Sequence, residues 1–226
     1  MLSKKAKVLQ TLAGKSFLEH IFSSTKKISD KISVVVGFDK NDVEKEVSKL
    51  SKIAKTFEQK NQIGTADAVK TVIEFIKENE KVLILYGDVP LIQESSLKKL
   101  CSLNNSLSIL TTNFNDPTGY GRVLKNSNGF VEEIIEEKDT NTEQKNIKEV
   151  FTGVMAVNGK ILKDLLPLIN NNNTSKEFYL TDLIGIANKN GFKIDSLSVS
   201  WEETLGANTR YEQEKLEQTY RKMKNE

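Results

Sequence analysis

The stretch that decides the fold is Ile84-Leu85-Tyr86-Gly87-Asp88-Val89-Pro90-Leu91-Ile92, an apolar run that ends in a glycine, a carboxylate and a proline. Such a run predicts a parallel strand that is buried on both faces. Open α/β sheets bind their ligands at the carboxyl ends of the strands, so Asp88 is expected where ligands bind. A metal-binding carboxylate would be useful at that place.

Length and composition limit the class of protein. The chain has 226 residues, which is enough to bury a full core, and we expect one domain. Its 33 Lys and Arg against 31 Asp and Glu give a formal charge of +2, so charge favours neither nucleic acid nor a membrane as partner. Cys101 is the only cysteine, which excludes an internal disulfide and fits a reducing cytoplasm. No stretch is long and apolar enough for a membrane span, so we expect a soluble, cytoplasmic protein.

Short apolar runs alternate with helical patterns in the first half of the chain. The expected strands cover residues 32–36, 53–57, 82–86 and 107–111, and the second of these is the weakest. A helix that begins at Gly64-Thr65, with Thr65 as its N-cap, places Val69, Val72, Ile73 and Ile76 on one apolar stripe. This alternation predicts a Rossmann-like α/β fold with a mostly parallel sheet and helices on both faces.

The pattern changes after residue 115. Residues 122–125 and 130–136 are expected to form a β-hairpin around Asn126-Ser127-Asn128-Gly129, because an Asn-Gly step suits a tight turn. Further strands are expected at residues 150–157 and 192–197, and helices at 161–169 and 180–189. The charged segment 211–226 is expected to be a helix that projects from the domain or leads to an absent one.

Several short motifs occur in the order found in sugar nucleotidyltransferases. They are Lys7-Val8-Leu9 with Leu12-Ala13-Gly14-Lys15, Gln62-Ile63-Gly64-Thr65-Ala66, Tyr86-Gly87-Asp88-Val89-Pro90-Leu91, Asp116-Pro117-Thr118-Gly119-Tyr120-Gly121-Arg122, Ile135-Glu136-Glu137-Lys138-Asp139, Thr152-Gly153, Tyr179-Leu180-Thr181-Asp182 and Gly206-Ala207-Asn208-Thr209-Arg210. Over nearly its whole length the chain resembles the uridyltransferase domain of bacterial bifunctional N-acetylglucosamine-1-phosphate uridyltransferases. One short motif is weak evidence, but this many in order are strong.

The resemblance implies transfer of a uridylyl group from UTP to N-acetylglucosamine 1-phosphate, giving UDP-N-acetylglucosamine for cell-wall synthesis. The nucleophile is an ionised phosphate, so this reaction needs positioning and charge neutralisation more than a general base. By resemblance, Asp88 and Asn208 are the protein ligands of a Mg²⁺ ion that bridges the phosphates. Lys7 matches the family lysine that contacts phosphate, and we take Lys7 and Asp88 as the catalytic pair.

The resemblance also assigns residues to the base and to the sugar. Gln59 falls where the family reads the uracil edge, which suits a carboxamide because it donates and accepts side by side. The other positions expected to line the substrate site are Gly64, Thr65, Tyr86 and Gly87 near the nucleotide, and Gly121, Glu136, Tyr179 and Thr181 near the N-acetylhexosamine.

Each candidate also has a plain structural reading. Asp88 before Val-Pro could cap a turn, and Lys7 taken alone would be a solvated surface lysine. Asn208 could be a loop side chain bonded to its own backbone, and Gln59 and Glu136 are individually ordinary polar residues. The order of the surrounding motifs is what favours the functional reading.

The chain departs from the family at three places. Related enzymes open with an apolar strand and a loop of the form Leu-Ala-Ala-Gly-x-Gly-x-Arg-Met, and the resemblance starts here at that methionine. That loop binds the triphosphate, so we interpret residues 1–210 as an N-terminally incomplete nucleotidyltransferase domain. The missing strand is expected to be central in the sheet, and its absence would leave unpaired backbone edges in the core. Phe151 replaces a family asparagine that bonds the sugar, which leaves the identity of the sugar open, and Ala6 replaces a proline.

Other functions remain open at this point. The chain could transfer another nucleotide to another sugar 1-phosphate, or it could be an inactive module that binds a nucleotide sugar. We find no hexapeptide repeat, so the acetyltransferase activity of the family's second domain is not predicted. Residues 211–226 would be the linker to that domain, and without it we expect a monomer or a weak oligomer.

Overall fold

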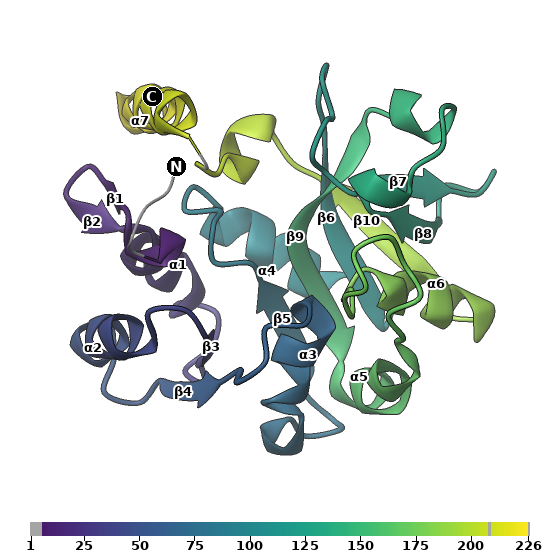
Figure 1. The fold of residues 1–226 in the computed structure, drawn as a ribbon, viewed down its shortest axis with the longest axis horizontal. Helices are drawn as coiled ribbons and strands as arrows, with labels where there is room; N and C mark the ends of the chain where they lie inside the picture. Colours follow the sequence, from purple (N-terminus) through teal and green to yellow (C-terminus); the bar gives the residue numbers. More distant parts are fainter. Residues whose placement is uncertain (1–5, 208, 226) are drawn as a thin grey trace. The chain divides into compact units, whose positions relative to one another are not determined.

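The computed structural model describes residues 6–207 and 209–225. Contacts between residues divide this part of the chain into two compact units that are discontinuous in sequence. The first unit takes residues 6–58, 86–98, 200–207 and 209–225, and the second takes residues 59–85 and 99–199. Figure 1 labels their helices and strands.

The first unit combines elements from the N-terminal and C-terminal parts of the described chain. Its elements are η1 (Lys7–Leu9), β1 (Thr11–Leu12), β2 (Lys15–Ser16), α1 (Phe17–Thr25), β3 (Ser33–Val36), α2 (Lys40–Leu50), β4 (Lys55–Glu58), η6 (Trp201–Thr204) and α7 (Arg210–Asn225). β3 and β4 pair in parallel, with α2 as the crossover between them, so this segment is a βαβ unit. The expected strands at residues 32–36 and 53–57 are therefore confirmed.

A two-residue hairpin that the sequence did not predict precedes α1. β1 and β2 pair antiparallel, and the turn residues Ala13 and Gly14 have φ angles of 49° and 81°. Positive φ at both central positions is the geometry of a type I′ turn. Ser16 then caps α1, because its side chain accepts a hydrogen bond of 3.0 Å from the backbone N–H of Glu19.

The C-terminal helix α7 packs within the first unit, so the expectation that it projects from the domain is wrong. Leu216 is fully buried in a cluster with Leu12 and Phe17, and Tyr220 packs against the same cluster. Gln213 reaches across to donate a hydrogen bond of 3.3 Å to the carbonyl of Thr11. The helix has few apolar positions, but they lie on one side, and that side is covered. Its role as a linker stays a prediction.

The second unit is built on a mixed sheet. Its elements are α3 (Thr65–Lys70), η2 (Ile73–Phe75), β5 (Lys81–Leu85), β6 (Leu107–Asn113), β7 (Arg122–Lys125), β8 (Val131–Ile135), η3 (Glu137–Asp139), η4 (Gln144–Asn146), β9 (Glu149–Asn158), α5 (Gly159–Leu165), η5 (Leu166–Leu168), α6 (Asp182–Lys189) and β10 (Ile194–Ser198). α4 (Glu94–Ser102) has residues in both units. The predicted hairpin is confirmed, with Gly129 at a φ of 83° in its turn.

The direction of β9 corrects the prediction of a mostly parallel sheet. β10 is parallel to β6, but β9 runs antiparallel to β5, β6 and β7. The β7–β8 hairpin reverses the chain, and the connection with the 3-10 turns η3 and η4 returns it past β7, so β9 runs in the same direction as β8 and opposite to β7. Figure 1 shows β9 as the long central strand beside β6, and α6 against the same sheet. The prediction of an α/β fold is nevertheless correct.

The core of the second unit is centred on β9. Residues 150–157 of this strand are buried on both faces, and residues 107–112 of β6 are buried beside them. β5 differs from the expectation of a strand buried on both faces, because residues 82–85 remain partly exposed. Among the described residues, β9 is the one strand to which β5 pairs.

No helix within residues 6–207 and 209–225 is both long and apolar enough to cross a membrane.

The helix after Gly64 is shorter than its apolar stripe indicated. α3 ends at Lys70 and gives way to the 3-10 turn η2. The sequence Thr71-Val72-Ile73 explains this, because three β-branched residues in a row disfavour an α-helix. Thr65 is the first residue of the helix, and Gly64 occupies the N-cap position, so the assignment of Thr65 as N-cap is wrong.

Candidate functional site

Lys7 and Asp88 lie side by side in the first unit. The Lys7 Nζ is 3.7 Å from an Asp88 carboxylate oxygen, and the two side chains are 47% and 42% exposed. Lys7 begins η1, and its position is fixed by Ala6, whose backbone N–H donates a hydrogen bond of 2.8 Å to Asp39. Asp88 follows β5 by three residues, as the sequence indicated. The pair offers a cation and a hard oxygen ligand that solvent and a ligand can reach.

Two glycines allow other segments to approach the Asp88 loop closely. A Cβ atom added at Gly87 would come within 2.6 Å of a Val8 methyl group, directly after Lys7. A Cβ added at Gly206 would come within 2.6 Å of the Asp88 carbonyl oxygen. The segment before residue 208 therefore packs against the Asp88 loop. Asn208 itself lies outside the described residues, so its pairing with Asp88 on a metal stays a prediction.

Gln59 lies in the second unit with its carboxamide held by two acceptors. Its Nε2 donates a hydrogen bond of 3.0 Å to the Gly64 carbonyl and one of 2.9 Å to an Asp67 carboxylate oxygen. The interpretation of Gln59 as a side chain that both donates and accepts for a base does not fit this arrangement, because both of its N–H groups are already used. Asp67 had no role in the sequence analysis.

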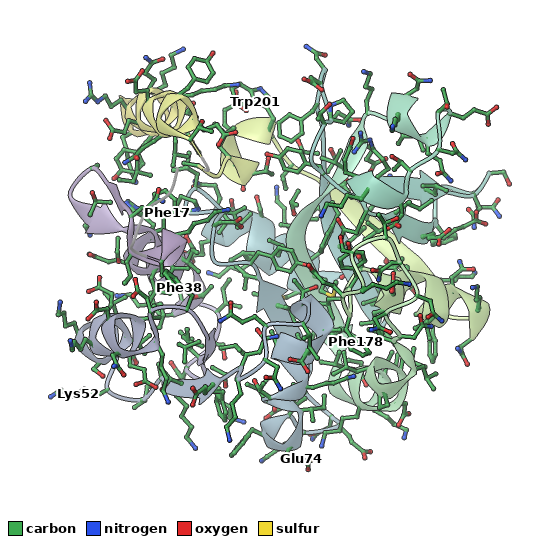
Figure 2. All side chains as sticks on the ribbon, viewed as in Figure 1. Phe17, Phe38, Lys52, Glu74, Phe178 and Trp201 are labelled. Carbon is green, nitrogen blue, oxygen red and sulfur yellow. The ribbon has the colours of Figure 1, made fainter. Side chains whose placement is uncertain are left out.

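A clasp of hydrogen bonds joins the Gly64 loop to the segment that carries Tyr179. We call the contacts of Ile63, Gly64, Thr65 and Ala66 with Phe178 and Leu180 the loop clasp. Backbone bonds run from Phe178 N to Ile63 O (2.8 Å) and from Ala66 N to Phe178 O (2.9 Å), and Leu180 N donates to Thr65 Oγ1 (2.8 Å). Figure 2 labels Phe178, whose ring lies 4.7 Å from the Lys70 Nζ.

Only glycine fits at the centre of the loop clasp. Gly64 has a φ of 135°, and a Cβ added there would lie 2.3 Å from the Phe178 carbonyl oxygen. Any other residue would push the two segments apart and would also be strained. The loop clasp therefore connects the positions expected at the base, Gly64 and Thr65, with those expected at the sugar, Tyr179 and Thr181.

The positions expected at the sugar converge on Glu136. Thr181 Oγ1 donates a hydrogen bond of 2.9 Å to one Glu136 carboxylate oxygen. The other oxygen lies 3.7 Å from the place of a Cβ at Gly121, where Ile134 would approach to 2.9 Å. The structure thus brings together Gly121, Glu136 and Thr181, as the resemblance implied.

Burial and neighbouring acids raise the pKa values around Glu136. Burial raises the pKa of Glu136, and Asp139 and Glu177 raise it further, while the hydrogen bond from Thr181 opposes the shift. Burial also raises the pKa of the Tyr179 phenol. Asp182, which begins α6, shows a larger effect, because burial first and then Glu136 and other acids raise its pKa to about 6. This side of the second unit therefore carries closely spaced acids that favour protonation.

An ion pair fixes the loop that carries Gly121. The Arg122 side chain is 1% exposed, and its guanidinium lies 2.6 Å from a Glu137 carboxylate oxygen. The same carboxylate accepts a hydrogen bond of 3.3 Å from the Gly119 backbone, and Arg122 also donates to the Tyr120 carbonyl. The Arg122 Nε is buried without a partner among the described residues. Glu137 therefore holds both the loop and a buried cation, a role that its sequence position did not indicate.

Phe151 is buried next to this loop. It is 6% exposed within β9, and its backbone N–H donates a hydrogen bond of 2.9 Å to the Gly121 carbonyl. A phenyl group at this position has no polar atom with which to bind a sugar substituent. The place beside Gly121 is therefore more apolar than the family pattern implies.

Comparison with known proteins agrees with the geometry. The chain is 41% identical over 214 residues to a protein named bifunctional protein GlmU from Campylobacter jejuni, which covers 94% of this chain and 49% of that protein. It is 39% identical over 231 residues to the protein of the same name from Clostridioides difficile, covering 100% and 50% of the two chains. The chain thus spans about half the length of these curated relatives.

A solved structure shares the fold at low sequence identity. It is described as CMP:2-keto-3-deoxy-manno-octonic acid synthetase complexed with CTP. The superposition covers 96% of this chain and 92% of the synthetase chain, with a TM-score of 0.69 and 16% sequence identity. At that identity the match shows the fold alone. Residues 2–134, more than half of the chain, match the family of MobA-like NTP transferase domains. The chain therefore belongs to the family of MobA-like NTP transferase domains.

Proposed function

We propose that this chain transfers a uridylyl group from UTP to N-acetylglucosamine 1-phosphate and releases pyrophosphate. In this reaction a phosphate oxygen of the sugar phosphate attacks the α-phosphorus of UTP, and the bond to the β-phosphate oxygen breaks. The observation that carries the proposal is the Lys7–Asp88 pair. With an ammonium and a carboxylate 3.7 Å apart, one group can neutralise the phosphates and the other can bind their divalent counterion. The GlmU relatives support the choice of substrates.

Lys7 and Asp88 have different roles in this proposal. The Lys7 ammonium neutralises charge on the triphosphate as a mobile point charge at the end of a long stem. Asp88 would hold Mg²⁺, with Asn208 as the second protein ligand that the resemblance implies. The fit is reasonable because Mg²⁺ takes one or two protein carboxylates and completes its shell with phosphates and water, so a larger acidic cluster is not needed. Bound there, the ion would supply further neutralisation of the phosphates.

The remaining candidates bind and orient the two substrates. We assign the base to Gln59 and the Gly64 loop, with Tyr86 and Gly87 beside the nucleotide. We assign the sugar to Gly121, Glu136, Tyr179 and Thr181, where Glu136 accepts from sugar hydroxyls. The loop clasp supports a shared role for the Gly64 loop and the segment of Tyr179 and Thr181, because it joins these two segments within the second unit. A cytoplasmic location goes with this proposal, since a single cysteine suits a reducing compartment.

The test is pyrophosphate release from UTP and N-acetylglucosamine 1-phosphate with and without Mg²⁺. We expect Asp88→Ala to reduce turnover by about a hundredfold or more, because charge that builds up on the phosphates loses its neutralising partner. The matched control is Asp42→Ala, which removes an exposed carboxylate paired with Lys45 on α2 at 3.0 Å. Asp42→Ala should keep normal turnover. Normal turnover in Asp88→Ala would remove Asp88 from the site.

Phe151 favours one alternative within the same reaction class. A buried phenyl group beside Gly121 suits a sugar without a polar N-acetyl contact at that place. Pyrophosphate release across a panel of UTP or dTTP with glucose 1-phosphate or N-acetylglucosamine 1-phosphate distinguishes these substrates. Tight binding of a UDP-sugar without turnover of any pair would instead indicate a module that only binds, and it would overturn the proposed reaction.

A further inference from the structure

Asp67 holds the side chain that the proposed function assigns to the base. Asp67 lies in the first turn of α3, eight positions after Gln59, and one of its carboxylate oxygens accepts from Gln59 Nε2 at 2.9 Å. The Gly64 carbonyl accepts from the same nitrogen at 3.0 Å. Both groups that face the carboxamide are acceptors, and this decides the orientation of the amide.

The two acceptors leave the Gln59 carboxamide with a single orientation. A carboxamide flipped by half a turn would direct its oxygen at the Gly64 carbonyl and at the Asp67 carboxylate, and acceptors repel one another. In the observed orientation both N–H groups are donated within the protein. The group that Gln59 can offer to a ligand is therefore its carbonyl oxygen, which is an acceptor.

We propose that Asp67 is a specificity-determining residue that makes Gln59 select bases with an N–H at position 3. The inference rests on the proposed function, in which Gln59 reads the base edge. Uracil carries a donor at N3, which an acceptor oxygen satisfies, whereas cytosine carries an acceptor at N3, which the same oxygen repels. A glutamine whose carboxamide can flip would satisfy either base, because it could present its oxygen to one and its NH₂ group to the other. By holding the amide, Asp67 removes that second choice and so favours uridine over cytidine nucleotides.

A purely structural role for Asp67 would affect the affinities for UTP and CTP differently from a role in selectivity. If the bond to Gln59 only tied the loop to α3, its loss would weaken both nucleotides equally or lower stability. A selectivity role changes the ratio of the two affinities. The ratio of the dissociation constants of CTP and UTP therefore separates the two roles.

The experiment measures equilibrium binding of UTP and of CTP, in the presence of Mg²⁺, to the full chain and its variants. Asp67→Ala removes the acceptor and should reduce the preference for UTP by about fivefold to tenfold. This is the range for one ordinary hydrogen bond, because the Gly64 acceptor still favours the same orientation of the carboxamide. Asp67→Asn keeps an oxygen that can accept but adds an amide that can also donate, so its preference should lie between those of the other two proteins. The matched control Glu74→Ala removes an exposed carboxylate from the neighbouring turn η2 (Figure 2) and should keep the wild-type ratio.

The outcomes separate this inference from the proposed function. A ratio in Asp67→Ala within twofold of wild type and of Glu74→Ala would overturn the role of Asp67 while leaving uridylyl transfer intact. Wild-type protein that binds UTP and CTP equally, or neither of them, would overturn the role of Asp67 together with the proposed base site. Should Asp67→Ala fail to fold, as judged by circular dichroism, Asp67→Asn decides, and an unchanged ratio in that variant would overturn the role.

Discussion

Replacing Asp182 by asparagine should stabilise the protein at neutral pH and leave it nearly unchanged in acid. Asp182 begins α6, and burial together with Glu136, Asp139 and Glu133 raises its pKa from the ordinary 3.8 to about 6. A carboxyl whose pKa is higher in the folded state binds more protons there than in the unfolded chain between pH 3.8 and about 6. Stability from this group is therefore lost as the pH rises through that window.

The change in the free energy of unfolding follows from the pKa shift of Asp182, reduced for solvent screening and for the favourable N-terminus of α6. A pKa change from 3.8 to about 6 corresponds to about 3 kcal/mol if the group is fully shielded from solvent. Asp182 is only half-buried, so solvent screens its repulsion from the other acids. The N-terminus of α6 also favours a negative charge. We therefore expect Asp182→Asn to raise the free energy of unfolding by about 1 kcal/mol at pH 7.5 and by nearly nothing at pH 4.

Urea unfolding followed by circular dichroism at pH 4, 5, 6 and 7.5 measures this difference. The control is Glu74→Gln, which changes an exposed acid in the same unit and should shift stability equally little at each pH. A stability difference between Asp182→Asn and wild type that stays constant from pH 4 to pH 7.5 would refute the reasoning. So would a variant that is less stable than wild type at pH 7.5.

Two further predictions concern hydrogen bonds that hold the loops of the second unit. Thr65→Val removes the acceptor for the Leu180 N–H, which joins the loop assigned to the base to the segment assigned to the sugar. It should therefore raise the KM for the sugar phosphate and the KM for UTP about fivefold each, as initial rates of pyrophosphate release would show. Thr65→Ser should restore both KM values. Glu137→Ala leaves the buried Arg122 guanidinium without its carboxylate and should lower the free energy of unfolding in urea by about 2–4 kcal/mol. The control Glu217→Ala, which breaks an exposed pair with Arg221, should cost less than about 0.5 kcal/mol.

Each of these predictions has a contrary result that the structure would not explain. A wild-type KM for the sugar phosphate in Thr65→Val would mean that Thr65 does not act on the sugar side through Leu180. A loss of stability in Glu137→Ala no larger than that in Glu217→Ala would mean that the Arg122 guanidinium finds other partners when Glu137 is absent.

Local sequence patterns predicted most of the fold because they depend on neighbours in the chain. Apolar runs located β3, β5 and β6, and the Asn-Gly step located the β7–β8 turn. The direction of β9 could not be predicted this way, because the residues of a buried strand are the same whichever way it runs. The length of α3 was overestimated because its apolar stripe continues into Thr71-Val72-Ile73, where helix propensity falls.

The motifs named candidate site residues, but they did not show which side chains hold one another. Ordered motifs pointed to Lys7 and Asp88, and the structure places their side chains together. Asp67 and Glu137 lie in the same motifs or beside them, but nothing in their spacing shows that they hold Gln59 and Arg122. The close approach of Gly64 to Phe178 likewise joins segments that no local pattern connects.

The packing of α7 on the hairpin that precedes α1 has a consequence for biosynthesis. Leu12 and Phe17 leave the ribosome long before Leu216, the apolar partner that covers them in the folded chain. Until α7 emerges, those side chains lack their final cover, so this cluster can close only after Leu216 has left the ribosome. During that interval the nascent chain exposes an apolar surface that chaperones would recognise.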